Sequence, residues 1–239
     1  MDNFEEILSQ LRNEHGKIDS TLHIIEKAIP IEEQMEYFNW AKNIRTPNDI
    51  QHKSFWIATL FTPEIDINKK KDALSILAGL PNVAAYRAIE TYNSSPLEAE
   101  LTNWAIMAYT ESKMLLNSDL SGEKQVLIST GLGGMRSKLR FFSVIVTLDK
   151  QHYTDLQKEI LTKELQFQFD QNQMEVEEFR FVENFVKIIF LASIEQNIKS
   201  IFNKIIDECN CLGCNLSKNF LLTNIKIFKD EEIRETLNK

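Results

Sequence analysis

Cysteine, histidine, proline and glycine are all scarce in this chain, with 3, 4, 5 and 7 copies among 239 residues. Three cysteines behind an acidic N-terminus without the features of a signal peptide exclude a disulfide-rich secreted scaffold, so we expect a cytoplasmic protein. The four histidines lie far apart in the sequence, which excludes an HExxH metalloprotease motif. Apolar runs are short too, because none approaches the roughly eighteen residues of a membrane-spanning helix. We therefore expect no membrane partner.

An excess of positive charge is also missing, since the net charge is −8. Nonspecific nucleic-acid binding depends on neutralising phosphates, and such an acidic chain is poorly suited to it. Residues 1–120 have 11 Lys or Arg against 18 Asp or Glu, whereas residues 121–239 have 16 against 17. One segment departs from this balance, because no acid lies between Glu123 and Asp149.

The first 120 residues do contain helical periodicity. Apolar side chains recur every three or four positions over residues 3–13, 18–29 and 31–44, which is the spacing of amphipathic helices. Residues 55–61 are apolar on almost all sides, so we expect that segment to be buried.

Residues 68–118 predict two or three short antiparallel helices. Within them, Ser95 and Glu98 have the spacing of a capping box, which predicts that a helix begins there. The segment resembles a helical hairpin of the HEAT or armadillo type, although no fixed repeat continues over the rest of the chain. The resemblance implies a HEAT-like, all-α first half.

Glu111 falls on the apolar stripe of this helix, which is an unusual place for an acid. Arg87 on the preceding helix is its natural partner, so we expect a buried or half-buried ion pair that holds the hairpin together. A catalytic carboxylate is the alternative reading, but no second acid is placed to work beside it.

After residue 120 the pattern changes to alternating strands and helices. Strand patterns cover residues 139–149, 177–182, 185–192 and 220–228, with an extra one at 126–130. Two helices separate them: one opens with a capping box at Thr154 and Gln157, and the other covers residues 197–210. The order strand, helix, strand, strand, helix, strand resembles the ferredoxin-like βαββαβ sandwich.

In such a sandwich one sheet face meets the two helices, and the other face needs a different cover. Alternation from residue 139 places Phe142, Val144 and Val146 on the helix-covered face, and Phe141 and Ile145 on the second face. The second face is too apolar to be left in water. Its cover would be the N-terminal helices, a second copy of the chain, or a ligand.

The segment between residues 131 and 140 combines glycines with basic residues. Its members are Gly131, Gly133, Gly134, Arg136, Lys138 and Arg140. It lacks the Gly-Lys-Ser/Thr element of a P-loop, and a strand pattern follows it rather than a helix. We therefore predict a hairpin in which the glycines supply positive φ angles, with the alternative that the three basic side chains hold a small anionic ligand.

All three cysteines lie close together, at Cys209, Cys211 and Cys214. Such thiolates can bind zinc, but no second pair of ligands exists, so we predict no metal, no other cofactor and ordinary packing at a helix end. A reactive thiol is a further alternative.

These patterns divide the chain into an acidic helical domain, 1–120, and a ferredoxin-like α+β domain, 121–239. No catalytic constellation occurs, and we name no catalytic residue. We predict a non-enzymatic interaction or adaptor module that binds a protein partner or a second copy of itself. The first alternative is a regulatory domain for a small anionic ligand near residues 131–140, and the second is an enzyme of undetermined class.

Overall fold

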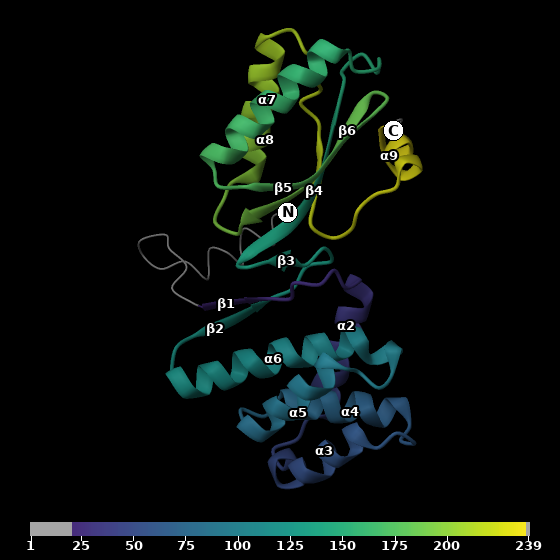
Figure 1. Cartoon of the computed structure of the whole chain (residues 1–239), viewed down its shortest axis with the longest axis vertical. Helices are drawn as coiled ribbons and strands as arrows, with labels where there is room; N and C mark the ends of the chain where they lie inside the picture. Colours follow the sequence, from purple (N-terminus) through teal and green to yellow (C-terminus); the bar gives the residue numbers. More distant parts are fainter. Residues whose placement is uncertain (1–20, 238–239) are drawn as a thin grey trace. The chain divides into compact units, whose positions relative to one another are not determined.

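The computed structural model describes residues 21–237, so the helix predicted over residues 3–13 lies outside the described part of the chain. The chain is a mixed α+β protein with an N-terminal helical part (Figure 1). It splits into two compact units. Unit 1 extends to Ile25 and resumes over Ile31–Ser129, and unit 2 contains Glu26–Pro30 and everything from Thr130 onward. None of the described helices is long and apolar enough to cross a membrane.

Unit 1 consists of helices and a two-stranded parallel sheet. Its elements are β1 (Thr21–Ile24), α2 (Ile31–Ile44), α3 (Lys53–Phe61), α4 (Ile67–Ala78), α5 (Val83–Ser94), α6 (Thr102–Ser121) and β2 (Gln125–Ile128), with short 3-10 helices at Asp49–His52 and Ala99–Leu101. The domain boundary predicted at residue 120 falls inside α6. Unit 1 continues past it to Ser129 and therefore includes β2.

The helix predicted over residues 18–29 is wrong for its described part, because Thr21–Ile24 forms strand β1. β1 pairs in parallel with β2, with Thr21 opposite Gln125 and Ile24 opposite Ile128. The pairing continues one residue further, where the Ile25 backbone N–H donates to the Ile128 carbonyl at 3.1 Å. A partner about a hundred residues away satisfies this backbone, so the local helical spacing does not decide its conformation.

The core of unit 1 surrounds α4, whose residues from Ala73 to Ala78 are all buried. Trp104 of α6 packs edge-on against Tyr37 at 5.3 Å and against Trp40 at 5.8 Å, so α2 and α6 meet through aromatic rings. The predicted helix start at Ser95 is wrong: Ser95 instead ends α5, and α6 begins at Thr102.

Unit 2 is a sheet with helices on both of its faces. Its elements are β3 (Gly134–Met135), β4 (Lys138–Val146), α7 (Asp155–Gln171), β5 (Glu175–Val182), β6 (Phe185–Ser193), α8 (Ile198–Cys211), β7 (Leu221–Thr223) and α9 (Asp230–Leu237). The sheet is antiparallel in the order β3-β4-β6-β5, and β7 pairs with β4 beside β3. The predicted capping box at Thr154 and Gln157 is confirmed at the start of α7.

Helices α7 and α8 cover the sheet face that carries Phe141, which reverses the predicted assignment of faces. Phe141 stacks on Phe190 of β6 at 5.6 Å. Phe190 in turn contacts Phe169 of α7 at 5.2 Å and Phe202 of α8 at 5.3 Å. These rings form a dry layer between the sheet and the two helices.

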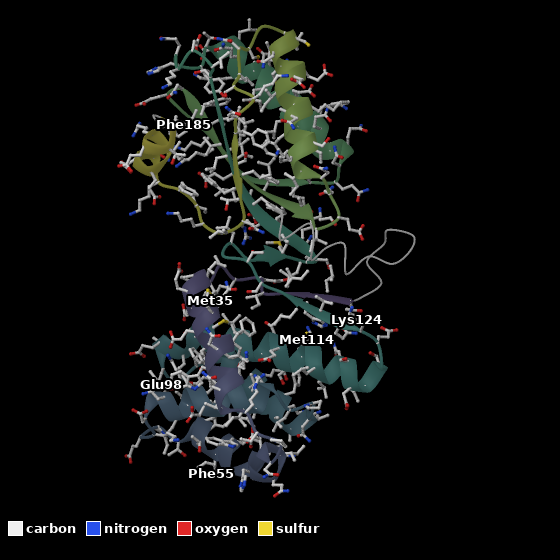
Figure 2. All side chains as sticks on the ribbon, turned by 180° about the vertical axis from the view of Figure 1, so that it is seen from behind. Met35, Phe55, Glu98, Met114, Lys124 and Phe185 are labelled. Carbon is white, nitrogen blue, oxygen red and sulfur yellow. The ribbon has the colours of Figure 1, made fainter. Side chains whose placement is uncertain are left out.

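The opposite face carries Phe142, Val144 and Val146, and the C-terminal part of the chain covers it. Ile233 of α9 is buried in this cluster, and Phe228 packs against it. Phe185 belongs to the same cluster and lies beneath α9, with the Arg234 guanidinium 6.0 Å from its ring (Figure 2). The predicted strand over residues 220–228 therefore ends early, at Thr223, and the chain goes on to α9.

Candidate functional site

The glycine and basic segment forms the tight turn between β3 and β4. Met135 pairs with Lys138, which leaves Arg136 and Ser137 as a two-residue loop. Both loop residues have positive φ, 53° and 80°, as in a type I′ hairpin turn. The structure thus contains a hairpin here, but the glycines do not supply its positive φ angles. Only Gly133 among the three has a positive φ, and it precedes the loop.

Two of the glycines are required for close backbone packing. A Cβ added at Gly131 would lie 1.7 Å from the Ile225 carbonyl oxygen, and one at Gly133 would lie 2.3 Å from the Glu26 carbonyl oxygen. Neighbouring backbone of the same unit therefore occupies the space next to these glycines, where a phosphate cradle would need an opening.

Two of the three predicted cations of this hairpin, Lys138 and Arg140, already have carboxylate partners. Lys138 Nζ lies 2.7 Å from Glu175 Oε1, and Arg140 bonds both oxygens of Glu177 at 2.5 and 2.8 Å. The hydrogen bonds from Arg140 to Glu177 raise the pKa of Arg140. The Arg136 backbone N–H also donates to Glu26 Oε1 at 3.1 Å. Within the described residues only the Arg136 guanidinium of these three cations lacks a bound carboxylate, and ligand binding at this hairpin stays a prediction.

Glu111 is buried, with 8% of its surface exposed, but its partner is Arg45 and not the predicted Arg87. Both terminal nitrogens of Arg45 donate to the Glu111 carboxylate at 2.7 Å, and the Tyr37 hydroxyl donates to it at 2.6 Å. Burial and the Glu111 charge hold the pKa of Tyr37 well above its ordinary value. Arg87 lies exposed on α5. This network satisfies its own charges, as a structural ion pair does.

A second buried ion pair was missed from the sequence. The Lys70 side chain is fully buried, and its ammonium donates to Glu98 Oε1. Glu98 also accepts a hydrogen bond of 2.5 Å from the Tyr92 hydroxyl, and Figure 2 labels it at the surface of unit 1. Glu98 therefore binds the α4 lysine and does not cap α6, which explains why the predicted helix start fails. The sequence signal was that Lys70 precedes the apolar residues Ala73, Leu74 and Leu77 by three, four and seven positions, so it shares their side of α4.

Helix α3 leaves apolar side chains exposed, although we expected this segment to be buried. Its buried residues are Thr59 and Leu60. Phe55 is 60% exposed and Phe61 is 39% exposed. Phe55, Ala58 and Phe61 are spaced three residues apart, so they share the outer side of a helix whose other side packs on α4 and α5. Figure 2 shows Phe55 at the outer surface of unit 1.

The three cysteines lie at the end of α8. Cys209 and Cys214 are buried and Cys211 is exposed. Burial, followed by the nearby Cys214, raises the pKa of Cys209 to about 12. Within residues 21–237 no group of three His, Cys, Asp or Glu side chains is arranged to hold a metal ion.

No family model matches the chain, and no curated protein matches it either. Nine solved chains do match. One of these structures is a crystal structure of a candidate transposase from Deinococcus radiodurans R1, which is 14% identical. The alignment covers 44% of this chain and 92% of that chain, with a TM-score of 0.37. A similarity this distant does not indicate what the present chain binds.

Proposed function

We propose that this protein is a non-enzymatic cytoplasmic interaction or adaptor module, and that α3 of unit 1 presents the binding face for a protein partner. The observation that carries the proposal is the exposed apolar side of α3, formed by Phe55, Ala58 and Phe61. Ile50, in the 3-10 turn just before α3, is 50% exposed and is a further apolar side chain that we assign to this face. We refer to these four residues as the α3 face.

Composition and packing both support the choice of α3. A surface helix normally places polar residues on its solvent side, yet α3 has the sequence KSFWIATLF and exposes two phenylalanines. Exposed aromatic side chains that are held in place are the residues that contribute most to protein interfaces. Phe55 is held edge-on against Trp56 at 5.0 Å, and Phe61 is held against Tyr92 at 6.2 Å.

We also propose an architecture for each of the two units. For unit 1 we propose a HEAT-like helical arrangement, which is supported by the packing of α5 on α6 and of α4 on both. For unit 2 we propose a ferredoxin-like sandwich, which is supported by the order of β4, α7, β5, β6, α8 and β7 and by the pairing of β7 and β6 on opposite edges of β4. Helical arrays and such sandwiches both serve widely as binding modules.

The proposal is tested by removing the aromatic rings from the α3 face. The full chain with Phe55→Ser and Phe61→Ser is compared with the wild type in an affinity purification at native expression level, followed by quantitative mass spectrometry. Leu156→Ser is the matched control, because Leu156 is 66% exposed on α7 and lies in the other unit. The expected result is at least about a tenfold loss of a specific co-purifying protein with the double variant and no loss with the control.

Three other results would decide against the α3 face. If the wild type retains no protein above background, the adaptor function is wrong. If the control and the double variant lose the partner equally, the partner binds elsewhere. If the only captured protein is this chain itself, and light scattering shows a dimer that the double variant abolishes, the face serves self-association.

A further inference from the structure

A pocket of about 270 Å³ lies inside unit 2, where the chain leaves β4. The loop after β4, the turn between β5 and β6, the segment before β7 and the helix α9 all contribute to it. Its polar lining residues are Thr147, Lys150, Asn184, Ser217, Asn219 and Thr236. Among residues 21–237 no carboxylate lines this pocket, in contrast to the β3–β4 hairpin, where glutamates neutralise Lys138 and Arg140.

Several donors in the pocket are available to a ligand. Among the described residues, the Lys150 ammonium and the side-chain amides of Asn184 and Asn219 have no hydrogen-bond or ion-pair partner. The Ser217 hydroxyl accepts from the Asn219 backbone N–H at 3.1 Å, so its own proton remains free to donate. One cation and three neutral donors thus line one cavity from three separate chain segments.

The acids nearest to these donors in the sequence are already engaged. Asp149 Oδ1 accepts from the Gln151 backbone N–H at 3.0 Å. Glu183 pairs with Arg234 of α9 at 3.3 Å. No carboxylate of the described residues is bound to the Lys150 ammonium. Lys138 and Arg140, by contrast, each pair with a glutamate.

The pocket also has an apolar side. Val146 and Leu148 belong to its lining. A smaller cavity of about 20 Å³ shares Asn219 and Thr236 with it and is otherwise lined by Val144, Leu221 and Ile233. A ligand that fits both has a polar head among the donors and a short apolar part directed toward the sheet face under α9.

We propose that this pocket binds a small organic oxyanion, with a carboxylate or phosphate head group held by Lys150, Ser217, Asn184 and Asn219. Carboxylate and phosphate share the chemistry that the donors recognise, because both offer several acceptor oxygens and negative charge. The proposal places the anion site away from residues 131–140. It stands independently of the α3 face, which belongs to unit 1. Because Thr236 of α9 lines the pocket, the ligand also stabilises the docking of α9 on the sheet.

The test is a titration of the ¹⁵N-labelled full chain, followed by its amide NMR shifts. Inorganic phosphate represents the head group alone, and isovalerate represents a carboxylate with a short aliphatic part. The expected result is saturable shifts at residues 147–150, 217–219 and α9 with at least one of them, at a Kd on the order of 1–10 mM for such small probes. Tighter phosphate binding indicates a phosphorylated ligand, and tighter isovalerate binding indicates an aliphatic carboxylate.

Lys150→Met removes the cation, and Arg136→Met is its matched control. Both positions are exposed basic residues in turns of unit 2, and both have positive φ, 59° and 53°. Lys150→Met is expected to weaken anion binding at least about tenfold, because one charge-assisted contact is lost. Arg136→Met is expected to leave anion binding unchanged. Asn219→Asp is a second variant at an exposed site, and the carboxylate that it places in the lining is expected to abolish binding.

The reverse pattern would overturn the proposal. Shifts centred on residues 131–140 that disappear with Arg136→Met would place the anion at the hairpin. Unchanged binding by both Lys150→Met and Asn219→Asp would remove the pocket as the site. The absence of saturable shifts with either probe below about 50 mM would mean that the pocket binds no such anion.

Discussion

The guanidinium of Arg45 donates from both terminal nitrogens to the carboxylate of Glu111, at 2.7 Å each, and its Nε donates to the Ser75 carbonyl at 2.8 Å. One arginine, just beyond the end of α2, thereby joins α2, α4 and α6. The Glu111 side chain is 10% exposed and that of Arg45 is 27% exposed, so the pair is mostly shielded from water.

Arg45→Met is expected to destabilise unit 1 by about 3 kcal/mol, because it leaves a buried carboxylate without its cation. Arg87→Met is the control, and its effect should stay within about 0.5 kcal/mol because Arg87 is exposed. All three tryptophans, Trp40, Trp56 and Trp104, lie in unit 1, so urea unfolding followed by tryptophan fluorescence measures this unit separately. Equal destabilisation by the two substitutions would contradict the assigned pairing.

The Lys70–Glu98 pair should be asymmetric toward substitution. Glu98→Gln leaves the Lys70 ammonium, whose side chain is 0% exposed, without a counter-charge, and should cost about 3 kcal/mol. Lys70→Met leaves a carboxylate that is 22% exposed and can be hydrated, so its cost should be less than half as large. The same fluorescence experiment compares them, and the opposite ranking would show that Lys70 finds another partner or reaches water.

The same pair predicts a pH dependence. Burial by itself would raise the pKa of Glu98, but hydrogen bonds from Lys70 and Tyr92 outweigh it and hold this pKa below its usual range. An acid with a lowered folded pKa stabilises the protein above its unfolded pKa, about 4.3, and that stabilisation is lost as the pH falls through the folded pKa. The unfolding free energy of unit 1 should therefore decrease on acidification below about pH 4.5. Glu98→Gln should flatten this decrease, and an unchanged pH profile in that variant would rule out Glu98 as its source.

The sequence predicted the elements of unit 2 better than it predicted what covers its sheet. The strand from residue 138 is apolar on both sides, with Phe141 and Ile145 on one face and Phe142 and Val144 on the other. Alternation therefore could not distinguish which face meets α7 and α8. The helix α9 has one buried apolar residue, Ile233, among charged ones, so it gave no helical stripe. Its acidic first turn, Asp230 to Glu232, was the available signal.

In unit 1 the errors came from contacts between residues far apart in the sequence. Glu111 was expected to pair with the adjacent helix, but Arg45 reaches it from 66 positions away. Residues 21–24 have helical spacing, yet β2 pairs with them. The exposure of Phe55 could not be predicted either, since a helix that is apolar all round is normally buried, and the face that α3 leaves open depends on where α4 and α5 lie.

The turn between β3 and β4 predicts a stabilising substitution. Ser137 has a φ of 80°, in the left-handed region that costs an L-residue with a side chain about 1–2 kcal/mol. Type I′ turns favour glycine at this second loop position. Ser137→Gly should therefore raise the unfolding free energy of unit 2 by about 1 kcal/mol, after the greater entropy of glycine in the unfolded chain is subtracted.

Ser137→Ala is the control for this turn, because it removes the hydroxyl and keeps the Cβ. It should give no gain. Unit 2 contains no tryptophan, so its unfolding is followed through the exposure of the buried thiols Cys209 and Cys214 to a thiol reagent in increasing urea. A gain with alanine equal to that with glycine would show that the hydroxyl, and not the backbone angle, is unfavourable.

The cysteines should differ sharply in reactivity. Cys211 is exposed, whereas Cys209 and Cys214 are buried. Burial raises the pKa of Cys214, and it raises that of Cys209 to about 12, so neither forms the reactive thiolate at pH 8. A thiol reagent should modify one cysteine per folded chain rapidly, and Cys211→Ser should abolish this fast phase. The other two should react only on unfolding, in parallel with the loss of structure. Rapid modification of two or three thiols in the folded chain would contradict ordinary packing at the end of α8, because it would require buried sulfur atoms that open to solvent or ionise near neutral pH.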